Sequence, residues 1–218
     1  MTDQIVDRAT TGIDGLDTVL NGGLIPNRSY MVSGRPGTGK TIVGLHFLTA
    51  GVEAGESCLY INLEESESAI RTNARTLGLG LDGVEFLDLA PTPDVFTAGQ
   101  QYGIFTPDEV EGEDVTDDIS ERVLSMEPDR VFVDPLTQLR NLSPDDYQFR
   151  KQVNGFMRFL TSQNATTVFT SQATRREPDD DLQFISDGSI ELEHGERGRR
   201  LTVSKFRGSA TKNGAHTV

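Results

Sequence analysis

The sequence predicts an α/β fold with a mostly parallel central sheet, helices on both faces and an antiparallel hairpin near the C-terminus. Three observations lead to this prediction. Short, nearly continuous apolar runs alternate with longer segments of helical periodicity, as expected for strands that are buried on both faces of a parallel sheet. A glycine-rich loop joins the first of these strands to a helix. Two strand-like segments near the C-terminus flank a short turn.

The predicted elements follow from apolar runs and from apolar residues spaced three and four positions apart. The predicted strands are 29–33, 57–63, 84–89, 130–134 and 166–172, and the hairpin pairs 184–193 with 200–207. The predicted helices are 10–20, 41–54, 65–77, 119–126 and 144–163. Residues 91–118 hold prolines, glycines and many acids without a clear period, and we expect a long surface excursion there; 177–181 is expected to be an acidic loop. The 218 residues are enough for one domain, predicted to span 1–218.

The loop from Gly34 to Thr41 matches the P-loop pattern G-x-x-x-x-G-K-[ST] and lies between a predicted strand and a predicted helix, as this motif requires. Gly34, Gly37 and Gly39 allow the backbone to curl so that several N–H groups point at one phosphate. The positive end of the helix dipole adds to this attraction. Lys40 is expected to reach the β- and γ-phosphates, and the Thr41 hydroxyl suits Mg²⁺. A plain glycine-rich turn explains the full pattern less well, so we predict nucleotide binding.

Besides the Thr41 hydroxyl, a P-loop site needs an acid to help hold Mg²⁺ and its water shell. Asp134 follows an apolar strand, which is the setting of a Walker B motif. The alternative is an aspartate that caps the next turn, helped by Pro135. ATP hydrolysis needs a base that takes a proton from water. Pro135, the residue after Asp134, cannot act as this base, so an acid from a neighbouring strand is needed. Glu64 and Glu65 follow the strand after the P-loop helix, and strand ends converge on the ligand in an open parallel sheet. We predict Glu64 as the base and Glu65 as its charged neighbour, the alternative being a surface pair that opens a helix.

Two basic residues near the C-terminus are candidates for stabilising charge in the transition state. Lys205 and Arg207 alternate on the last predicted strand, so their side chains share one face. The alternative is a solvated strand edge with protective charges, and the sequence favours neither. The turn residues Arg197, Arg199 and Arg200 are expected to be solvated.

The order of these pieces resembles the KaiC family of RecA-type ATPases, over nearly the whole chain, with RadA-like proteins as more distant relations. The resemblance is carried by residues 11–17, 22–24, 34–41, 64–65, 73–75, 134, 185–187 and 205–208. Lys-x-Arg-Gly at 205–208 is the most specific of these motifs. The resemblance implies a RecA-like fold, subunits assembled in a ring (a hexamer is expected) and ATP held between neighbours. It implies that the first glutamate of the pair, Glu64, is the base, and that Lys205 and Arg207 reach the γ-phosphate of the neighbouring subunit's nucleotide.

The resemblance also extends the expected nucleotide site. The residues expected to bind ATP are Gly34, Pro36, Gly37, Thr38, Gly39, Lys40, Thr41, Ile42, Thr76, Leu77, Gly78, Lys205, Phe206, Arg207 and Ser209. Thr76 to Gly78 correspond in place to residues that line the adenine. Catalysis is assigned to Glu64, Glu65, Lys40, Lys205 and Arg207, and the metal to Thr41 and Asp134. The chain departs from the best-known clock protein, which has two such domains in tandem and an autophosphorylated Ser-Thr pair in the second.

These observations favour a slow Mg²⁺-dependent ATPase with a regulatory role. The alternatives left open are a nucleotide-gated binding module with little hydrolysis, a KaiC-type autokinase and a RadA-like recombination protein. The net charge of −14 and the lack of a basic-aromatic patch argue against a nucleic-acid partner. The single cysteine, Cys58, lies in an apolar run that predicts a buried strand, and no apolar run reaches the length of a membrane span. We expect a cytoplasmic protein without a signal peptide.

The acidic composition leads to a prediction about salt. Net charge of −14 with a pI near 4.6 and scarce lysine is typical of a surface solvated at high salt, so we hypothesise a salt-loving source. Screening of like charges should then stabilise the fold, and the melting temperature should rise with KCl concentration. Thermal melts over a KCl series test this hypothesis, and a melting temperature that falls as KCl is raised would contradict it.

Overall fold

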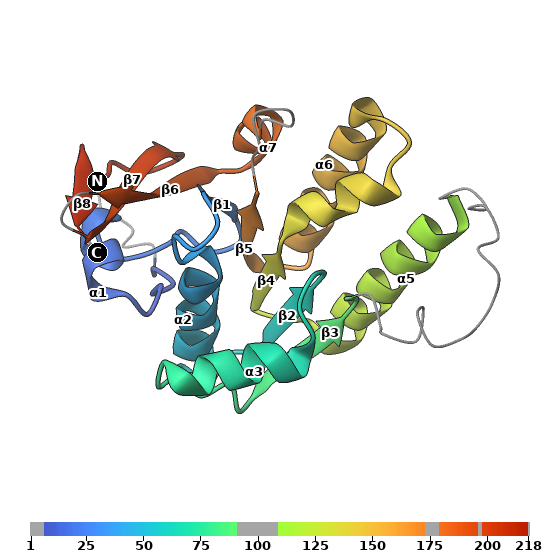
Figure 1. Ribbon diagram of the computed structural model, residues 1–218, viewed down its shortest axis with the longest axis horizontal. Helices are drawn as coiled ribbons and strands as arrows, with labels where there is room; N and C mark the ends of the chain where they lie inside the picture. Colours follow the sequence, from blue (N-terminus) through green and yellow to red (C-terminus); the bar gives the residue numbers. More distant parts are fainter. Residues whose placement is uncertain (1–6, 91–108, 173–178, 196–197, 218) are drawn as a thin grey trace, which may run out of the picture.

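The computed structural model describes residues 7–90, 109–172, 179–195 and 198–217. Within these ranges, one sheet has the strand order β3-β2-β4-β5-β1-β6-β7-β8 (Figure 1). All neighbours from β3 to β6 are parallel, whereas β6–β7 and β7–β8 are antiparallel. The predicted α/β fold with a mostly parallel sheet and a C-terminal hairpin is therefore confirmed, and it is consistent with a RecA-like fold.

The element bounds follow the predicted ones closely in the parallel part of the sheet. The strands are β1 (Ser29–Gly34), β2 (Cys58–Asn62), β3 (Val84–Asp88), β4 (Arg130–Asp134), β5 (Thr166–Ser171), β6 (Gly188–Gly195), β7 (Gly198–Phe206) and β8 (Ala215–Thr217). The helices are α1 (Asp14–Val19), α2 (Lys40–Glu53), α3 (Glu67–Thr76), α5 (Glu109–Met126), the 3₁₀-helix η1 (Leu136–Leu142), α6 (Asp146–Ser162) and α7 (Asp180–Ile185).

Alternation along the central strands divides the core into two clusters. Tyr60 and Phe132 point to the face that packs under α1, α2 and α3, where Leu16, Leu45 and Ile70 belong to the same cluster. The intervening residues of the same strands, such as Ile61 and Val133, point to the opposite face and pack with α5, α6 and α7. Because both faces are covered, these strands are apolar throughout, as the sequence predicted.

Three expectations about local structure were wrong. The excursion was expected to continue to 118, but α5 already begins at Glu109; residues 91–108 lie outside the described ranges. Acids are favoured in the N-terminal part of a helix, and Val115, Ile119 and Val123 continue the helical spacing onto the sheet. The acidic loop expected at 177–181 overlaps the start of α7, and residues 184 and 185 belong to α7 rather than to the hairpin. In the described part of the chain, η1 and β8 were not predicted at all.

Helix α2, which follows the P-loop, lies unusually close to the sheet. A Cβ added at Gly44 would meet ring atoms of Phe132 at 2.0 to 2.3 Å, so only a glycine allows this approach. About two turns further on, a Cβ added at Gly51 would lie 2.5 Å from Arg130 Cδ and 2.6 Å from Cys58 Sγ. Burial raises the pKa of the Cys58 thiol to about 12, as expected for the buried strand residue that the sequence predicted. The glycines therefore fix the distance between α2 and β4.

Among the described residues, no helix combines the length and the apolar character needed to cross a bilayer.

The close approach of α2 to the sheet predicts that Gly44→Ala destabilises the protein, although a Gly→Ala change within a helix ordinarily stabilises it. Gly44→Ala should lower the free energy of unfolding by about 1–3 kcal/mol, because the new methyl group would collide with Phe132. Gly155→Ala in the exposed part of α6 is the matched control: nothing lies within 4 Å of the added Cβ, and the change should stabilise the protein by about 0.5–1 kcal/mol. Urea denaturation measures both effects, and equal stability of the two variants would contradict the packing argument.

Candidate functional site

The P-loop curls at the carboxyl end of β1, where α2 begins. Gly39 has a φ of 101° and precedes the first residue of α2, and Gly34 lies so close to β6 that a Cβ there would be 2.4 Å from the Leu192 carbonyl oxygen. Lys40 Nζ donates to the carbonyl oxygens of Gly34, at 3.0 Å, and Arg35, at 3.4 Å. The lysine therefore lies inside the curl of the loop, at the place where phosphate oxygens would be held.

Burial shapes the electrostatics of Lys40. Its side chain is almost fully buried, and burial lowers the pKa of its ammonium group from the usual value, while the charges of Asp134 and Glu64 partly oppose this shift. The two acids are thus close enough to Lys40 to act on it electrostatically. A polyphosphate in the loop would add negative charge beside the ammonium group and would favour its protonated form.

The carboxylate of Asp134 collects hydroxyl groups from three elements. Thr41 Oγ1, in the first turn of α2, donates to Asp134 Oδ2 at 2.7 Å. Tyr60 on β2 donates through its hydroxyl to the same oxygen at 3.1 Å. Thr170 on β5 donates to Asp134 Oδ1. The predicted metal residues Thr41 and Asp134 are therefore in contact, and their hard oxygen donors suit Mg²⁺.

The glutamate pair is held at the end of β2 by its neighbours. Asn62, the last residue of β2, donates through its amide to the Glu65 carbonyl oxygen and, at 3.0 Å, to Asp88 on β3. Glu64 points toward the end of β5, where Gln172, the residue after this strand, donates through Nε2 to its carboxylate at 2.7 Å. Both glutamates are exposed. Glu64 is thus placed between β2 and β5 on the same edge of the sheet as the P-loop and Asp134, which is where the sequence argument expected a base.

A cavity of about 400 Å³ opens beside the P-loop between α2 and α3. Its lining includes predicted site residues from the P-loop, the glutamate pair and the end of α3, namely Gly37, Gly39, Lys40, Thr41, Ile42, Glu65, Thr76 and Leu77. Gly78 lies instead on a separate cavity of about 360 Å³ behind α2. Leu77 is 55% exposed, so an apolar surface is available where the family resemblance expects adenine.

Arg199 also lines this cavity, although the sequence indicated only a solvated turn. Its guanidinium nitrogen Nη1 would lie 3.1 Å from a Cβ added at Gly39, so it overhangs the P-loop. Arg200 remains exposed on β7, and Arg197 lies outside the described residues. The long hairpin strand β7 brings Arg199 to the site, and its position depends on the pairing of β7 with β6, in which Arg199 faces His194.

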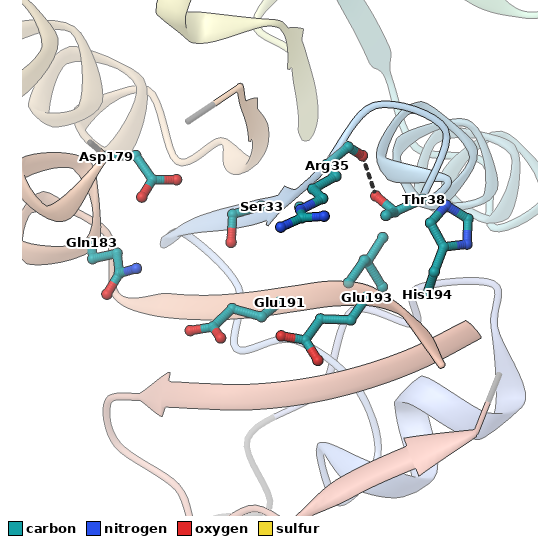
Figure 2. A pocket seen from close by; sticks show the side chains of 10 residues that line it. Ser33, Arg35, Thr38, Asp179, Gln183, Glu191, Glu193 and His194 are labelled. Atoms are coloured by element: carbon teal, nitrogen blue, oxygen red, sulfur yellow. Dashed lines mark hydrogen bonds between the residues drawn. The ribbon is translucent and has the colours of Figure 1, made fainter. Parts of the chain in front are cut away.

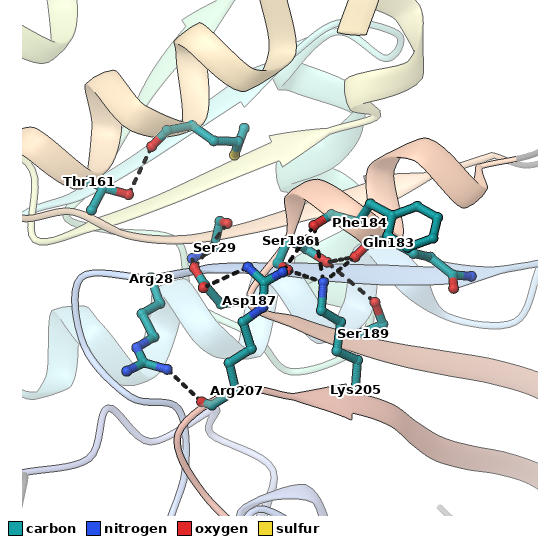
Figure 3. A network of polar contacts seen from close by, with 11 residues as sticks. Arg28, Ser29, Thr161, Gln183, Phe184, Ser186, Asp187, Ser189, Lys205 and Arg207 are labelled. Atoms are coloured by element: carbon teal, nitrogen blue, oxygen red, sulfur yellow. Dashed lines mark hydrogen bonds and ion pairs between the residues drawn. The ribbon is translucent and has the colours of Figure 1, made fainter.

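The other predicted basic residues, Lys205 and Arg207, lie near the start of β1, away from the P-loop, in a network of polar contacts with Asp187 and the end of α7 (Figure 3). Lys205 pairs with Ser189 on β6, which pairs with Met31 near the start of β1, whereas the P-loop follows the end of β1. Lys205 Nζ donates to the carbonyl oxygens of Gln183, Phe184 and Ser186, at 2.5, 3.2 and 2.6 Å. These contacts cap the C-terminal end of α7. Within one chain, Lys205 therefore serves α7 and does not reach the P-loop.

Arg207, Phe206 and Ser209 share this location. The Arg207 side chain is 54% exposed and forms an ion pair with Asp187 at 3.6 Å. The ring of Phe206 stacks on Tyr30, and Ser209 accepts a hydrogen bond from Arg8 Nη2 at 2.8 Å. The sequence-based site thus divides into two groups at opposite ends of the parallel sheet.

A larger cavity of about 540 Å³ lies on the other side of the P-loop (Figure 2). Glu191 and Glu193 on β6 border it, together with Asp179 and Gln183 at α7 and with Arg35 of the P-loop. Three carboxylates around this cavity, two on β6 and one at α7, disfavour a triphosphate, so the smaller cavity beside Lys40 and Thr41 is the better nucleotide site.

Within the described ranges, no group of three or more His, Cys, Asp and Glu side chains is arranged to hold a metal ion. A magnesium ion at Thr41 and Asp134 would therefore need phosphate oxygens and water to complete its coordination, which is the usual manner of Mg²⁺ binding in nucleotide sites.

A family model described as "ATPase: KaiC" matches residues 9–218. A UPF0273 protein of Methanopyrus kandleri is 31% identical over 219 residues, covering 94% of this chain and 85% of the relative. A UPF0273 protein of Thermotoga maritima is 29% identical over 220 residues, with 94% and 89% covered.

The chain is also similar to the circadian clock oscillator protein KaiC of Parasynechococcus marenigrum. The identity is 30% over 234 residues, and the match covers 98% of this chain but only 43% of that protein. The chain therefore spans less than half the length of this clock protein.

Proposed function

The chain belongs to the KaiC family of ATPases, and from this premise we propose that it binds Mg²⁺-ATP and hydrolyses it slowly in a ring-like oligomer. Its nucleotide state would regulate protein partners, which makes it a signalling ATPase. The contact of Thr41 with Asp134 beside the buried Lys40 is the observation that carries the proposal. These are the groups that a triphosphate and its metal require.

Nucleotide binding is supported by the P-loop and the cavity beside it. Lys40 would exchange its carbonyl contacts for β- and γ-phosphate oxygens, and the backbone N–H groups at the start of α2 would hold the same phosphates. Thr41 and Asp134 would hold Mg²⁺, which would neutralise charge on the β- and γ-phosphates. Arg199 and Leu77 would border the rest of the nucleotide in the cavity of about 400 Å³.

Hydrolysis is supported by the position of Glu64. Its carboxylate is exposed at the strand ends, acts on Lys40 electrostatically and is oriented by Gln172. In the proposed reaction, Glu64 takes a proton from a water molecule, whose oxygen forms a bond to the γ-phosphorus while the bond to the β–γ bridging oxygen breaks. Glu65 borders the cavity but points toward Asn73, with 3.4 Å between its Oε2 and Asn73 Nδ2, so it is the supporting charge.

An oligomer is supported by the separation of the predicted site residues into two groups, one at the P-loop and one around Lys205 and Arg207. Lys205 and Arg207 lie too far along the sheet to act on the P-loop of their own chain, so they would serve the nucleotide of a neighbouring subunit. Such a contact joins two different faces of the chain, and repeated contacts of this kind close into a ring. Phe184, which is 78% exposed beside these residues, offers an apolar anchor for that face.

The role of Glu64 predicts a separation of binding from hydrolysis. Glu64→Gln should lower the single-turnover rate of ATP hydrolysis by about 10²–10⁴-fold, because the base is lost, while ATP affinity stays the same. Fluorescence titration with a labelled nucleotide measures the affinity, and release of radiolabelled phosphate measures the rate.

Glu65→Gln is the matched control and should retain most of the activity. If Glu64→Gln hydrolyses ATP at the parent rate, Glu64 is not the base. If the parent itself binds ATP without any single-turnover hydrolysis, the chain is a nucleotide-gated binding module instead.

The role of Arg207 predicts complementation between inactive subunits. Glu64→Gln and Arg207→Ala should each be nearly inactive alone. In co-expressed mixed rings, about one quarter of the sites would combine an intact Glu64 with a neighbour's intact Arg207, so about one quarter of the parent activity should return. Steady-state ATPase assays on purified mixed rings, with ring formation checked by light scattering, give the measurement.

An arginine that acted within its own chain would leave every mixed site defective. If rings shown to contain both chains are no more active than the mean of the two variants measured alone, action on the neighbour would therefore be ruled out.

A further inference from the structure

We propose that Tyr60, with Thr170, is a positioning residue that holds the Asp134 carboxylate ready for the metal of a bound nucleotide. The proposal rests on the proposed function, because it concerns the same nucleotide site. Neither residue was predicted from the sequence, where Tyr60 is one member of an apolar run and Thr170 one polar residue near a strand end.

The Tyr60 ring is fixed by its surroundings. The residue is 1% exposed, and its ring packs against Phe86 and Phe132 with centroids 5.1 and 4.9 Å away. Tyr60 lies opposite Phe132 in the pairing of β2 with β4, and Asp134 is two residues further along β4 on the same face. The register of the two strands therefore aims the phenol hydroxyl at the carboxylate.

The hydroxyl of Tyr60 is a donor near neutral pH, because a tyrosine hydroxyl ordinarily loses its proton only near pH 10. A buried hydroxyl requires a hydrogen-bond partner, and Asp134 Oδ2 supplies it at 3.1 Å.

The donors leave one direction of the carboxylate open. A carboxylate has about four acceptor positions, two on each oxygen. Thr41 and Tyr60 take those of Oδ2, and Thr170 takes one on Oδ1. The remaining position on Oδ1 would stay available to the metal or to water bound to it, since a Walker B aspartate helps to hold the Mg²⁺ of a P-loop site.

The choice of hydroxyl groups as partners has a further consequence. A lysine or arginine in contact with Asp134 would neutralise the carboxylate and compete with a divalent cation. Neutral hydroxyl groups orient the carboxylate and leave its negative charge in place. In the described residues, the side-chain hydrogen bonds to Asp134 come from the hydroxyl groups of Thr41, Tyr60 and Thr170, while Lys40 donates to carbonyl oxygens of the P-loop.

The test compares nucleotide affinity with and without magnesium. The affinity for ADP is measured by titration calorimetry on the full chain in excess Mg²⁺ and again in EDTA, and the ratio of the two affinities measures the coupling between metal and nucleotide. Tyr60→Phe should reduce this ratio at least about tenfold, because loss of a hydrogen-bond partner of a metal ligand typically lowers metal affinity about 10–100-fold, while the affinity in EDTA stays unchanged. Thr170→Val, which removes the hydroxyl, should reduce the ratio in the same way. Thr170→Ser, which keeps the hydroxyl, should retain the parent ratio.

Tyr30→Phe is the matched control. Tyr30 is also 1% exposed and stacked on a phenylalanine, but its hydroxyl accepts from the Ile25 N–H at 2.9 Å and donates to the Ile25 carbonyl oxygen at 2.8 Å, away from Asp134. It should leave the ratio unchanged. Folding of each variant is checked by circular dichroism, and if Tyr60→Phe does not fold, the two Thr170 variants decide.

The outcomes separate the two proposals. A parent that does not bind ADP overturns the proposed function. A parent with strong magnesium coupling, together with variants that keep the parent ratio, overturns the positioning role alone.

Discussion

The carboxylate of Asp134 is the point on which the arrangement of the site depends. It receives hydrogen bonds from α2, β2 and β5, so the P-loop helix and two neighbouring strands are tied to the end of β4. The glycine at position 44 makes this possible, because it lets α2 approach Phe132 closely enough for the Thr41 hydroxyl to reach β4. The hydrogen bonds that hold Asp134 come from neutral hydroxyl groups, and this keeps its charge available to a cation.

Much of the site could be predicted from the sequence because its signals are local. The P-loop, the acid after β4 and the glutamate pair after β2 each adjoin a strand that the apolar pattern identifies, and parallel strands bring their ends to one edge. Tyr60 could not be found in this way, because its role depends on the diagonal relation between β2 and β4. Arg199 was missed for a similar reason, since only the register of the hairpin brings it over Gly39.

The errors in secondary structure have physical causes as well. The many acids before 119 suggested an exposed loop, yet acids suit the first turns of α5, and the apolar residues of this helix recur at a spacing of four. The helix α7 was missed because it has only six residues and ends where Lys205, distant in sequence, binds its carbonyl oxygens. A short helix stabilised by a contact between distant residues gives no periodic signal.

The two basic residues near the C-terminus do not have equal freedom to serve a neighbouring subunit. Lys205 donates to three carbonyl oxygens at the end of α7, one of them on the fully buried Ser186, and releasing it would cost α7 these three hydrogen bonds. Arg207 is more exposed and forms a longer ion pair, 3.6 Å from Asp187, which solvent screens. Under the proposed function, Arg207 would therefore reach the neighbour's phosphate at the smaller cost, whereas Lys205 would have to give up its hydrogen bonds to the end of α7.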